Sequence, residues 1–236
     1  MDLILRFAIK NKVSVLAIQE PHINTTHKLD YVTKRFNKKG FSLICPVTIE
    51  GRGGAALAFS ASLSLVSFKL LSDRLCFASL KSDDGQIFNF LSVHMHHRGP
   101  TRSSQWRSLL SDTDFTLPDQ TIVLGDFNSV IVPTRDTASP LLESSDAPST
   151  FAAQGARNLE LEFIRRTGLQ DSYAVVHSER SKDTNLGGFT WGFPPDPPPS
   201  QLSPQPPAKR PCPQFQRLSV ENDRRRRLDR ILVPPA

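Results

Sequence analysis

The feature that most constrains the fold is an apolar run that ends in a polar turn. Residues 121–124 are apolar or β-branched, and Gly125, Asp126, Phe127 and Asn128 follow them. A strand that is apolar throughout is typical of a sheet covered on both faces by helices or by a second sheet. If the chain stays extended past the glycine, Asp126 and Asn128 share one face and Phe127 packs on the other. The segment therefore predicts a layered fold.

The polar residues of this segment have two interpretations. A carboxylate can bind a metal ion or accept a proton, and an amide beside it can orient a ligand without adding negative charge. Glycine, aspartate and asparagine are also favoured turn residues, so the segment can be an ordinary exit from a strand. The rest of the chain has to distinguish a site from a turn.

The size of the chain and its cysteines limit the class of protein. The 236 residues are enough for one large α/β domain, and we expect a single domain over residues 1–236. There is no apolar run of about eighteen residues and no signal-peptide pattern, so we expect an intracellular protein with no membrane partner. Because Cys45, Cys76 and Cys212 are few and far apart, we expect reduced structural thiols rather than a disulfide framework or a zinc site.

Five of the six units of formal net positive charge come from one segment. Residues 207–230 hold eight of the 29 basic residues and three of the 23 acidic ones, which leaves 21 and 20 elsewhere. Four arginines are consecutive: Arg224, Arg225, Arg226 and Arg227. Such a run favours a phosphate-rich partner such as DNA through counterion release. It can also be a solvated surface run or a nuclear import signal, and the second of these places the protein in the nucleus.

Hydrophobic periodicity predicts an α/β or α+β architecture with more than one sheet. Helices are expected over residues 3–9, 28–39, 103–110 and 151–167. Strands are expected over residues 13–18, 41–47, 53–60, 63–71, 75–82, 87–95, 121–124, 187–193 and 227–233. The strands of the middle third, with polar turns between them, are typical of an antiparallel meander. Residues 194–213 hold ten prolines and predict an extended, disordered insertion.

Acidic residues lie in or at the ends of three of these strands. Glu20 ends the apolar run VSVLAIQE, Asp126 follows TIVLG, and Asp229 lies within RRLDRILV. Oxygen ligands of this kind suit Mg²⁺ or Mn²⁺, which keep some of their waters and are completed by a substrate phosphate. Two alternatives stay open. Glu20 can be an N-cap or a loop acid before a proline, and Asp229 can form a surface ion pair with the arginines beside it.

Seven motifs, in one order along almost the whole chain, resemble a known family. They are LAIQEP with Glu20, GGAALAFS, FLSVHMHHRGP, VLGDFNSV with Asp126 and Asn128, TGLQDSYAVVHSE, FTW at residues 189–191, and RRLDRILV with Asp229. This set resembles the endonuclease/exonuclease/phosphatase superfamily, and within it the apurinic-like endonuclease domains of non-LTR (LINE-type) retrotransposons. One of these motifs alone is a weak signal, whereas the ordered set is specific.

The resemblance implies a fold and a substrate. The fold is a four-layer α/β sandwich of two face-to-face mixed β-sheets flanked by helices. The implied activity is that of a metal-dependent phosphodiesterase that nicks DNA, with Mg²⁺ or Mn²⁺ as its cofactor. By the same resemblance, Thr190 and Trp191 are expected on a surface that contacts DNA.

The resemblance also implies roles for four residues. Glu20 would bind the divalent ion, and Asp126 would bind it too or activate the attacking water. Asn128 would hold that water or a phosphate oxygen. Asp229 would orient a C-terminal histidine, which would neutralise charge on the leaving group together with the metal.

Some features depart from the family pattern. The chain lacks the initial strand with its asparagine and the final Ser-Asp-His strand, so the domain is expected to be incomplete at both termini. At His94 retrotransposon members usually have tyrosine, whereas secreted nucleases and phospholipases have histidine. His94 can donate to the scissile phosphate or be a satisfied polar residue at a strand end. His96 and His97 have no role implied by the resemblance.

Three functions remain open. The first is a metal-dependent endonuclease derived from a retroelement, with a reverse transcriptase domain encoded downstream as a partner. The second is a catalytically impaired remnant that keeps the fold and at most binds nucleic acid. The third is a phosphodiesterase that acts on RNA or a lipid, which His94 favours weakly.

Overall fold

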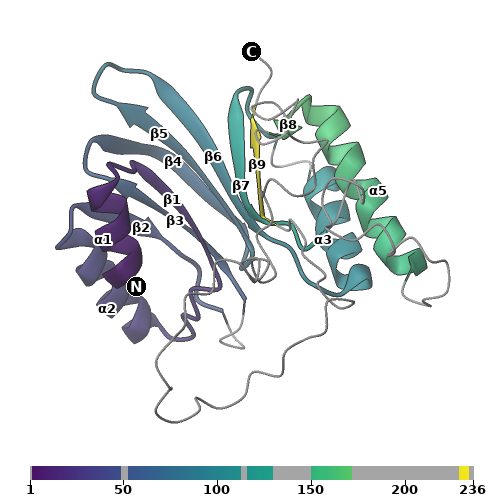
Figure 1. The fold of residues 1–236 in the computed structure, drawn as a ribbon, viewed down its shortest axis with the longest axis horizontal. Helices are drawn as coiled ribbons and strands as arrows, with labels where there is room; N and C mark the ends of the chain where they lie inside the picture. The colour runs from purple at the N-terminus through teal and green to yellow at the C-terminus, as the bar shows by residue number, and fades with distance from the viewer. Residues whose placement is uncertain (1, 49–52, 113–115, 130–149, 172–228, 234–236) are drawn as a thin grey trace, which may run out of the picture.

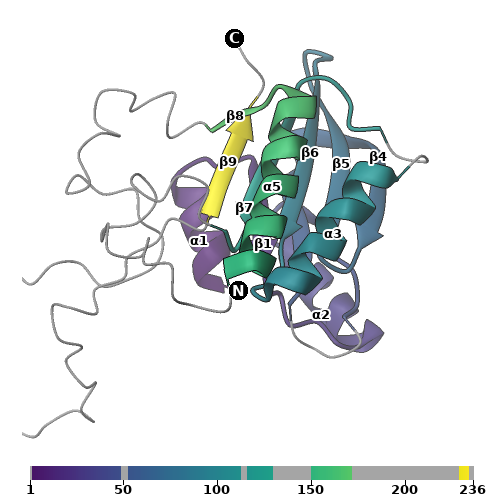
Figure 2. The same ribbon diagram turned by 90° about the vertical axis from the view of Figure 1, so that its right-hand side faces the viewer.

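The structure is a computed structural model that describes residues 2–48, 53–112, 116–129, 150–171 and 229–233 (Figures 1 and 2). Its helices are α1 (Asp2–Lys10), α2 (Thr26–Asn37), α3 (Gly99–Ser111) and α5 (Thr150–Thr167). Its strands are β1 (Val15–Gln19), β2 (Phe41–Ile44), β3 (Ala55–Ser60), β4 (Leu63–Ser72), β5 (Leu75–Ser82), β6 (Ile87–His94), β7 (Thr121–Asp126), β8 (Gln170–Asp171) and β9 (Asp229–Val233). The expected helices and strands within these ranges are present, with shifts of a few residues at their ends.

The strands form two sheets. The smaller sheet has the order β1-β3-β2, and both of its pairings are antiparallel. The larger sheet has the order β4-β5-β6-β7-β9-β8, and β6 pairs with β7 in parallel while its other pairings are antiparallel. The larger sheet is therefore mixed, as expected. Within the described residues both pairings of the smaller sheet are antiparallel, and the strand expected over residues 187–193 lies outside the described part of the chain.

Helices cover the outer face of each sheet, which gives the four layers that the motifs predicted (Figure 1). One apolar cluster lies between α1, α2 and the smaller sheet, and another between α3, α5 and the larger sheet. In Figure 2, α3 and α5 lie side by side across the larger sheet. A third cluster fills the space between the two sheets, with Leu57 from β3 and Leu80 from β5 both fully buried. Each of the two sheets is thus covered on both faces over most of its strands, whereas β4 at the edge of the larger sheet is largely exposed.

The antiparallel meander predicted for the middle third covers only β4, β5 and β6. The two strands before it, β2 and β3, pair with each other in the smaller sheet. Only residues 61 and 62 separate β3 from β4, so the chain crosses from one sheet to the other in a turn. Strand spacing does not show such a crossing, because a tight turn can join strands of one sheet or of two packed sheets.

The apolar strand at residue 121 has the environment that its sequence predicted. Val123 belongs to the cluster under the helices, and Ile122 and Leu124 pack against the cluster between the sheets. Both faces of β7 therefore meet apolar side chains, which explains why its sequence does not alternate. The proline-rich residues 194–213 lie outside the described part of the chain. No helix among the described residues is both long and apolar enough to span a membrane.

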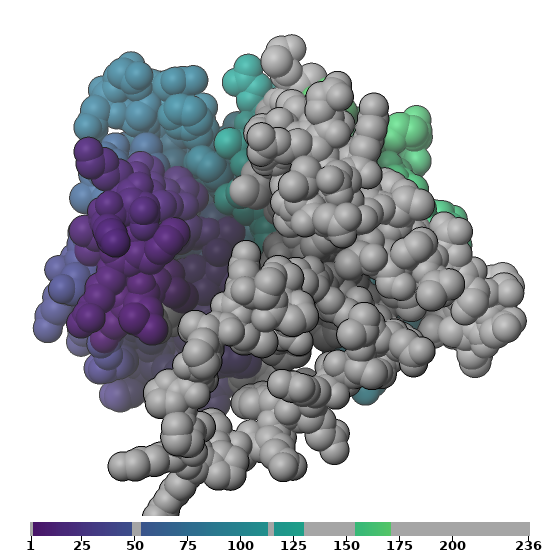
Figure 3. Space-filling view, in the orientation of Figure 1, coloured from purple at the N-terminus to yellow at the C-terminus, as the bar shows by residue number. Residues whose placement is uncertain are grey.

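Phe36 and Phe7 offer a matched test of the core beneath α1 and α2. The side chain of Phe36 in α2 is fully buried, whereas Phe7 in α1 is 62% exposed, and α1 stands at the molecular surface (Figure 3). We expect Phe36→Ala to lower the free energy of unfolding by about 3–5 kcal/mol, because it removes apolar contacts and leaves a cavity. Phe7→Ala should change it by less than about 0.5 kcal/mol. Urea titrations of both variants measure the difference, and equal losses would contradict this placement of the core.

Cys45 and Cys76 are free and buried, as the sequence predicted. Burial raises the pKa of each thiol to about 12. At about pH 8 only about one thiol in 10⁴ is then ionised, and the thiolate is the reactive form. We therefore expect iodoacetamide to leave both residues unmodified in the native protein and to label both in urea. Peptide mass spectrometry reads the two sites separately, and rapid labelling of either one in the native state would contradict its burial.

Candidate active site

The larger sheet places three of the expected site residues next to one another in register. In the parallel pairing of β6 with β7, His94 lies opposite Asp126. In the antiparallel pairing of β7 with β9, Asp126 lies opposite Asp229. The chain after β6 remains tied to β7, because the Met95 amide donates to the Asp126 carbonyl at 2.8 Å. The backbones of all three positions therefore meet at one end of this sheet.

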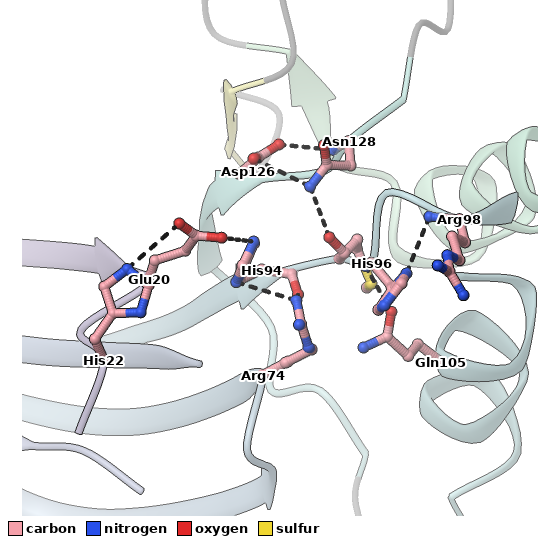
Figure 4. Close-up of polar contacts among 10 residues, drawn as sticks. Glu20, His22, Arg74, His94, His96, Arg98, Gln105, Asp126 and Asn128 are labelled. Carbon is pink, nitrogen blue, oxygen red and sulfur yellow. Dashed lines mark hydrogen bonds and ion pairs between the residues drawn. The ribbon is translucent and has the colours of Figure 1, made fainter. Parts of the chain in front are cut away.

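Asp126 and Asn128 form a closed pair just after β7 (Figure 4). The Asn128 amide donates to Asp126 Oδ1 at 2.8 Å, and Asn128 Nδ2 donates to Asp126 Oδ2 at 3.1 Å. Asn128 Nδ2 also donates to the Met95 carbonyl at 2.8 Å. These bonds leave the Asn128 carbonyl oxygen and the outer lone pairs of the Asp126 carboxylate as the acceptors that can meet a ligand.

The predicted juxtaposition of Asp126 and Asn128 is correct, but its predicted cause is wrong. Asn128 has a φ of 49°, so the chain turns there rather than staying extended. Asparagine tolerates this left-handed conformation better than most residues. Phe127 points the other way and is fully buried beneath α3 and α5. The segment is thus both a turn and a source of two converging polar groups.

Glu20 comes to the same place from the smaller sheet. It follows β1 directly with a φ of 51°, and its amide donates to the Gly54 carbonyl at 3.0 Å. Its Oε1 lies 3.7 Å from His94 Nε2, and its Oε2 lies 3.7 Å from His22 Nε2. Glu20 is not the N-cap of α2, because that position is Thr25. Its carboxylate is therefore exposed at the rim and directed at His94.

His94 is the point at which the two acidic residues meet. Its side chain is almost fully buried at the end of β6, the Glu20 carboxylate reaches its Nε2 (Figure 4), and Asp126 is its neighbour in register on β7. Beneath it, Gln19 Nε2 at the end of β1 lies 3.5 Å from Ser92 Oγ in β6, within reach of a hydrogen bond between the sheets. Glu20 and Asp126, 106 positions apart in sequence, thus both lie next to His94 at the rim of the sandwich.

The charge state of His94 follows from its surroundings. Burial lowers the pKa of the imidazole, and the Arg74 guanidinium lowers it further. The carboxylates of Asp126 and Glu20 raise the pKa and offset part of this effect, as does a backbone hydrogen bond to Gly54. The net direction is downward, which favours the neutral imidazole.

Two further histidines begin the connection to α3. The rings of His96 and His97 stack with centroids 4.4 Å apart. The His96 amide donates to Gln105 Oε1 at 2.8 Å, and the Arg98 amide donates to His96 Nδ1 at 3.0 Å. Arg102 Nη1 donates to the carbonyls of both histidines, at 3.1 and 3.0 Å. These bonds fix the path of the chain from β6 to α3, a structural role that the sequence did not predict.

The structure describes only one of the remaining predicted site residues. The backbone of Asp229 lies in β9 opposite Asp126. Thr190, Trp191 and the run Arg224–Arg227 lie outside the described residues, so their expected contacts with DNA stay predictions. Conversely, sequence analysis missed Arg74, which contacts His94 from the turn between β4 and β5. A lone arginine in a turn carries no motif, so no signal in the sequence singles it out.

The donor set at the rim fits a hard divalent cation. Glu20 and Asp126 supply carboxylate oxygens and Asn128 supplies an amide oxygen. Mg²⁺ commonly takes only one or two protein carboxylates and completes its shell with waters and phosphate oxygens. Within the described ranges no three histidine, cysteine or acidic side chains converge closely enough to hold a metal alone. The site therefore suits an ion shared with water and substrate rather than one enclosed by protein.

Solved structures show what the chain is similar to. No protein-family model and no curated protein matches it. An AP endonuclease from Archaeoglobus fulgidus is 17% identical with a TM-score of 0.63, over 99% of this chain and 81% of that one. The endonuclease domain of TRAS1, a telomere-specific non-LTR retrotransposon, is 12% identical with a TM-score of 0.52, over 97% and 76%. ANGEL2, a 2′,3′-cyclic phosphatase, is 19% identical over 56% and 44%, with a TM-score of 0.41.

These likenesses establish the class of fold. The chain has the endonuclease/exonuclease/phosphatase fold, as its motifs predicted, and resembles the endonuclease domains of AP endonucleases and of a LINE-type element. The chain spans less than half of the length of ANGEL2. At identities this low the likenesses concern the fold, so activity and substrate have to be argued from the site.

Proposed function

We propose that this chain is a metal-dependent phosphodiesterase that nicks DNA. One observation carries the proposal: at the rim of an endonuclease-type fold, the Glu20 carboxylate lies 3.7 Å from the buried imidazole of His94, whose neighbour in register on the next strand is Asp126. Hydrolysis of a phosphodiester needs negative charge to be stabilised on the phosphate and a proton to be taken from the attacking water. Carboxylates that can bind a cation and accept a proton, beside an imidazole that can donate, supply these needs.

Each residue has a distinct part in this proposal. Glu20 and Asp126 would hold Mg²⁺ or Mn²⁺, which would polarise the phosphate and stabilise charge on its oxygens. Asp126 also accepts the proton of the attacking water, and Asn128 keeps its carboxylate in place through the bonds at 2.8 and 3.1 Å. His94 donates to a phosphate oxygen. As the water oxygen bonds to phosphorus, the P–O bond to the leaving oxygen breaks. The leaving oxygen takes a proton from solvent and Asp126 returns its proton to solvent, which gives a phosphate monoester and a hydroxyl.

The substrate assignment rests on the fold and on charge. Relatives of similar fold are described as an AP endonuclease and a retrotransposon endonuclease domain. The chain carries basic groups that suit a nucleic acid, with Arg74 against His94 and with four consecutive arginines at residues 224–227. They favour a polyanionic ligand. We extend the proposal to an origin in a LINE-type retroelement, a reverse transcriptase domain encoded downstream, and action in the nucleus.

A plasmid-nicking assay tests the proposal. With Mg²⁺ or Mn²⁺, the purified chain should convert supercoiled plasmid to nicked circles, and EDTA should stop the reaction. Glu20→Gln should lower the rate by about 10²-fold or more, because it removes a charged ligand of the ion. Glu162→Gln is the matched control, since Glu162 pairs only with Arg165 and Arg166 among the described side chains of α5.

Each outcome of this assay distinguishes between functions. Equal nicking by the wild type, Glu20→Gln and Glu162→Gln would mean that the activity comes from a contaminant. Salt-sensitive retention of DNA without cleavage would favour the impaired remnant. Cleavage of RNA or of a phospholipid at a higher rate than DNA would favour the third function left open by the sequence.

A further inference from the structure

Arg74 holds the imidazole of His94 from the side opposite Glu20 (Figure 4). Its Nη1 lies 3.2 Å from His94 Nδ1 and donates to the His94 carbonyl at 3.4 Å. The two residues are also joined through their backbones, because the His94 amide donates to the Arg74 carbonyl at 3.0 Å. These three contacts fix both the ring and the strand end that carries it.

Gly53 shows how closely the guanidinium is packed. It has a φ of +74°, and a Cβ built on it would lie 2.2 Å from Arg74 Nη2 and 2.5 Å from Cζ. Only a residue without a side chain lets the backbone before β3 approach the guanidinium in this way. The guanidinium of Arg74 therefore packs between the backbone of Gly53 and the ring of His94.

The contact with Nδ1 determines where the proton of His94 lies. A guanidinium has five N–H donors and no acceptor, so a ring nitrogen that bonds to it must accept. In a neutral imidazole one nitrogen accepts and the other carries the proton. With Nδ1 accepting from Arg74, the proton of His94 lies on Nε2, the atom that faces Glu20 across 3.7 Å.

We propose that Arg74 is a positioning residue that fixes His94 in its Nε2–H tautomer, so that the imidazole presents a hydrogen-bond donor to an oxyanion at the rim. The purpose of this role rests on the proposed function. The tautomer itself can be measured whether or not the chain has that activity. An Nε2–H cannot bind a metal ion or take a proton from water, so His94 is assigned to the phosphate rather than to the cation. The 3.7 Å separation from Glu20 Oε1 exceeds a hydrogen bond, so a ligand oxygen would compete with Glu20 and with the Gly54 backbone for the N–H of the imidazole.

Nitrogen NMR of the full chain tests the tautomer directly. In protein labelled with ¹⁵N at histidine, the two ring nitrogens of a neutral imidazole resonate far apart, according to which one carries the proton. The spectrum is recorded at about pH 8, above the ordinary histidine pKa of about 6.5. We expect Nε2 of His94 to show the protonated signature and Nδ1 the unprotonated one. The reverse pattern, or an even mixture of the two, in the wild type would overturn the proposal.

Variants of Arg74 separate positioning from structural support. Arg74→Lys keeps a donor and should keep the Nε2–H signature. Arg74→Met removes the donor and should shift the population toward a mixture of tautomers, while Arg74→Glu offers an acceptor and should move the proton to Nδ1. Backbone amide spectra report whether each variant is folded. An unchanged His94 signature in folded Arg74→Met and Arg74→Glu would overturn the proposal, and the wild-type spectrum decides the tautomer even if a variant does not fold.

Inorganic phosphate, added without metal, probes the donor. We expect it to shift the His94 Nε2 resonance in the wild type and to shift it less in Arg74→Met. A chain that shows the predicted tautomer but no nicking would refute the proposed activity and leave the role of Arg74 intact. A chain that nicks DNA but carries the proton of His94 on Nδ1 would refute the role of Arg74 and leave the proposed activity intact.

Discussion

Asp126→Asn should abolish most phosphodiester hydrolysis, with a fall in rate of about 10²–10⁴-fold. The substitution keeps the shape of the side chain but removes its charge and its ability to accept a proton. The Asn128 amide can still donate to the remaining Oδ1, as it does at 2.8 Å in the native turn, so the fold should persist. Plasmid nicking measures the rate, and urea unfolding measures the stability.

Asp83→Asn is the matched control for this substitution. Asp83 is an exposed aspartate in the turn between β5 and β6, at the opposite end of β6 from His94. We expect its nicking rate to remain within about twofold of the wild type, because exposed charges act weakly across water. A loss of activity that is the same in both variants would show that net charge, rather than the carboxylate at the end of β7, controls the reaction.

Gly125→Ala should disrupt the sheet at the point where the site is built. Gly125 has a φ of +143°, which side chains rarely adopt, and a Cβ there would lie 1.9 Å from the Val93 carbonyl oxygen. That oxygen belongs to the backbone of the neighbouring strand β6, in which Val93 pairs with Gly125. The clash can be relieved only by moving β6 and β7 apart, so we expect a loss of at least about 4–5 kcal/mol in stability and complete loss of activity.

Gly85→Ala is the matched control for Gly125→Ala, because it measures the cost of backbone strain without the clash with a neighbouring strand. Gly85 also has a positive φ, of +91°, but a Cβ on it would meet only the flexible end of Lys81 at 3.8 Å. We expect Gly85→Ala to lower the stability by about 1 kcal/mol, which is the cost of a side chain in a left-handed conformation. Thermal unfolding of both variants gives the comparison, and similar losses for the two would mean that the contact with Val93 is not rigid.

The sequence predicted those parts of the fold and site that depend on local pattern. The apolar run before Gly125 marked β7 as a buried strand, and the acids at strand ends marked Glu20 and Asp126 as partners. Their placement at one rim was expected from strand ends, whereas His94 was left open between a donor to the phosphate and a satisfied polar residue. Asn128 was predicted to lie beside Asp126, although the turn that brings it there was not.

Features that depend on contacts between distant segments could not be read from the sequence. Arg74 lies in an ordinary polar turn, and only the packing of Gly53 and the end of β6 around it gives it a role. The division of the middle strands between two sheets is also not visible in the sequence. The apolar patterns of β3 and β4 do not specify which strands they pair with. Pairing is decided by the cores on either side of each sheet, which are formed from the whole chain.

The most direct test of the central claim is the location of a bound cation. Crystals soaked in Mn²⁺ would be examined by anomalous diffraction, which locates manganese without reference to activity. We expect one principal peak between the carboxylates of Glu20 and Asp126, and its loss in crystals of Glu20→Gln. Manganese bound elsewhere, with no peak at these two carboxylates, would contradict the claim that acids from the two sheets bind one ion.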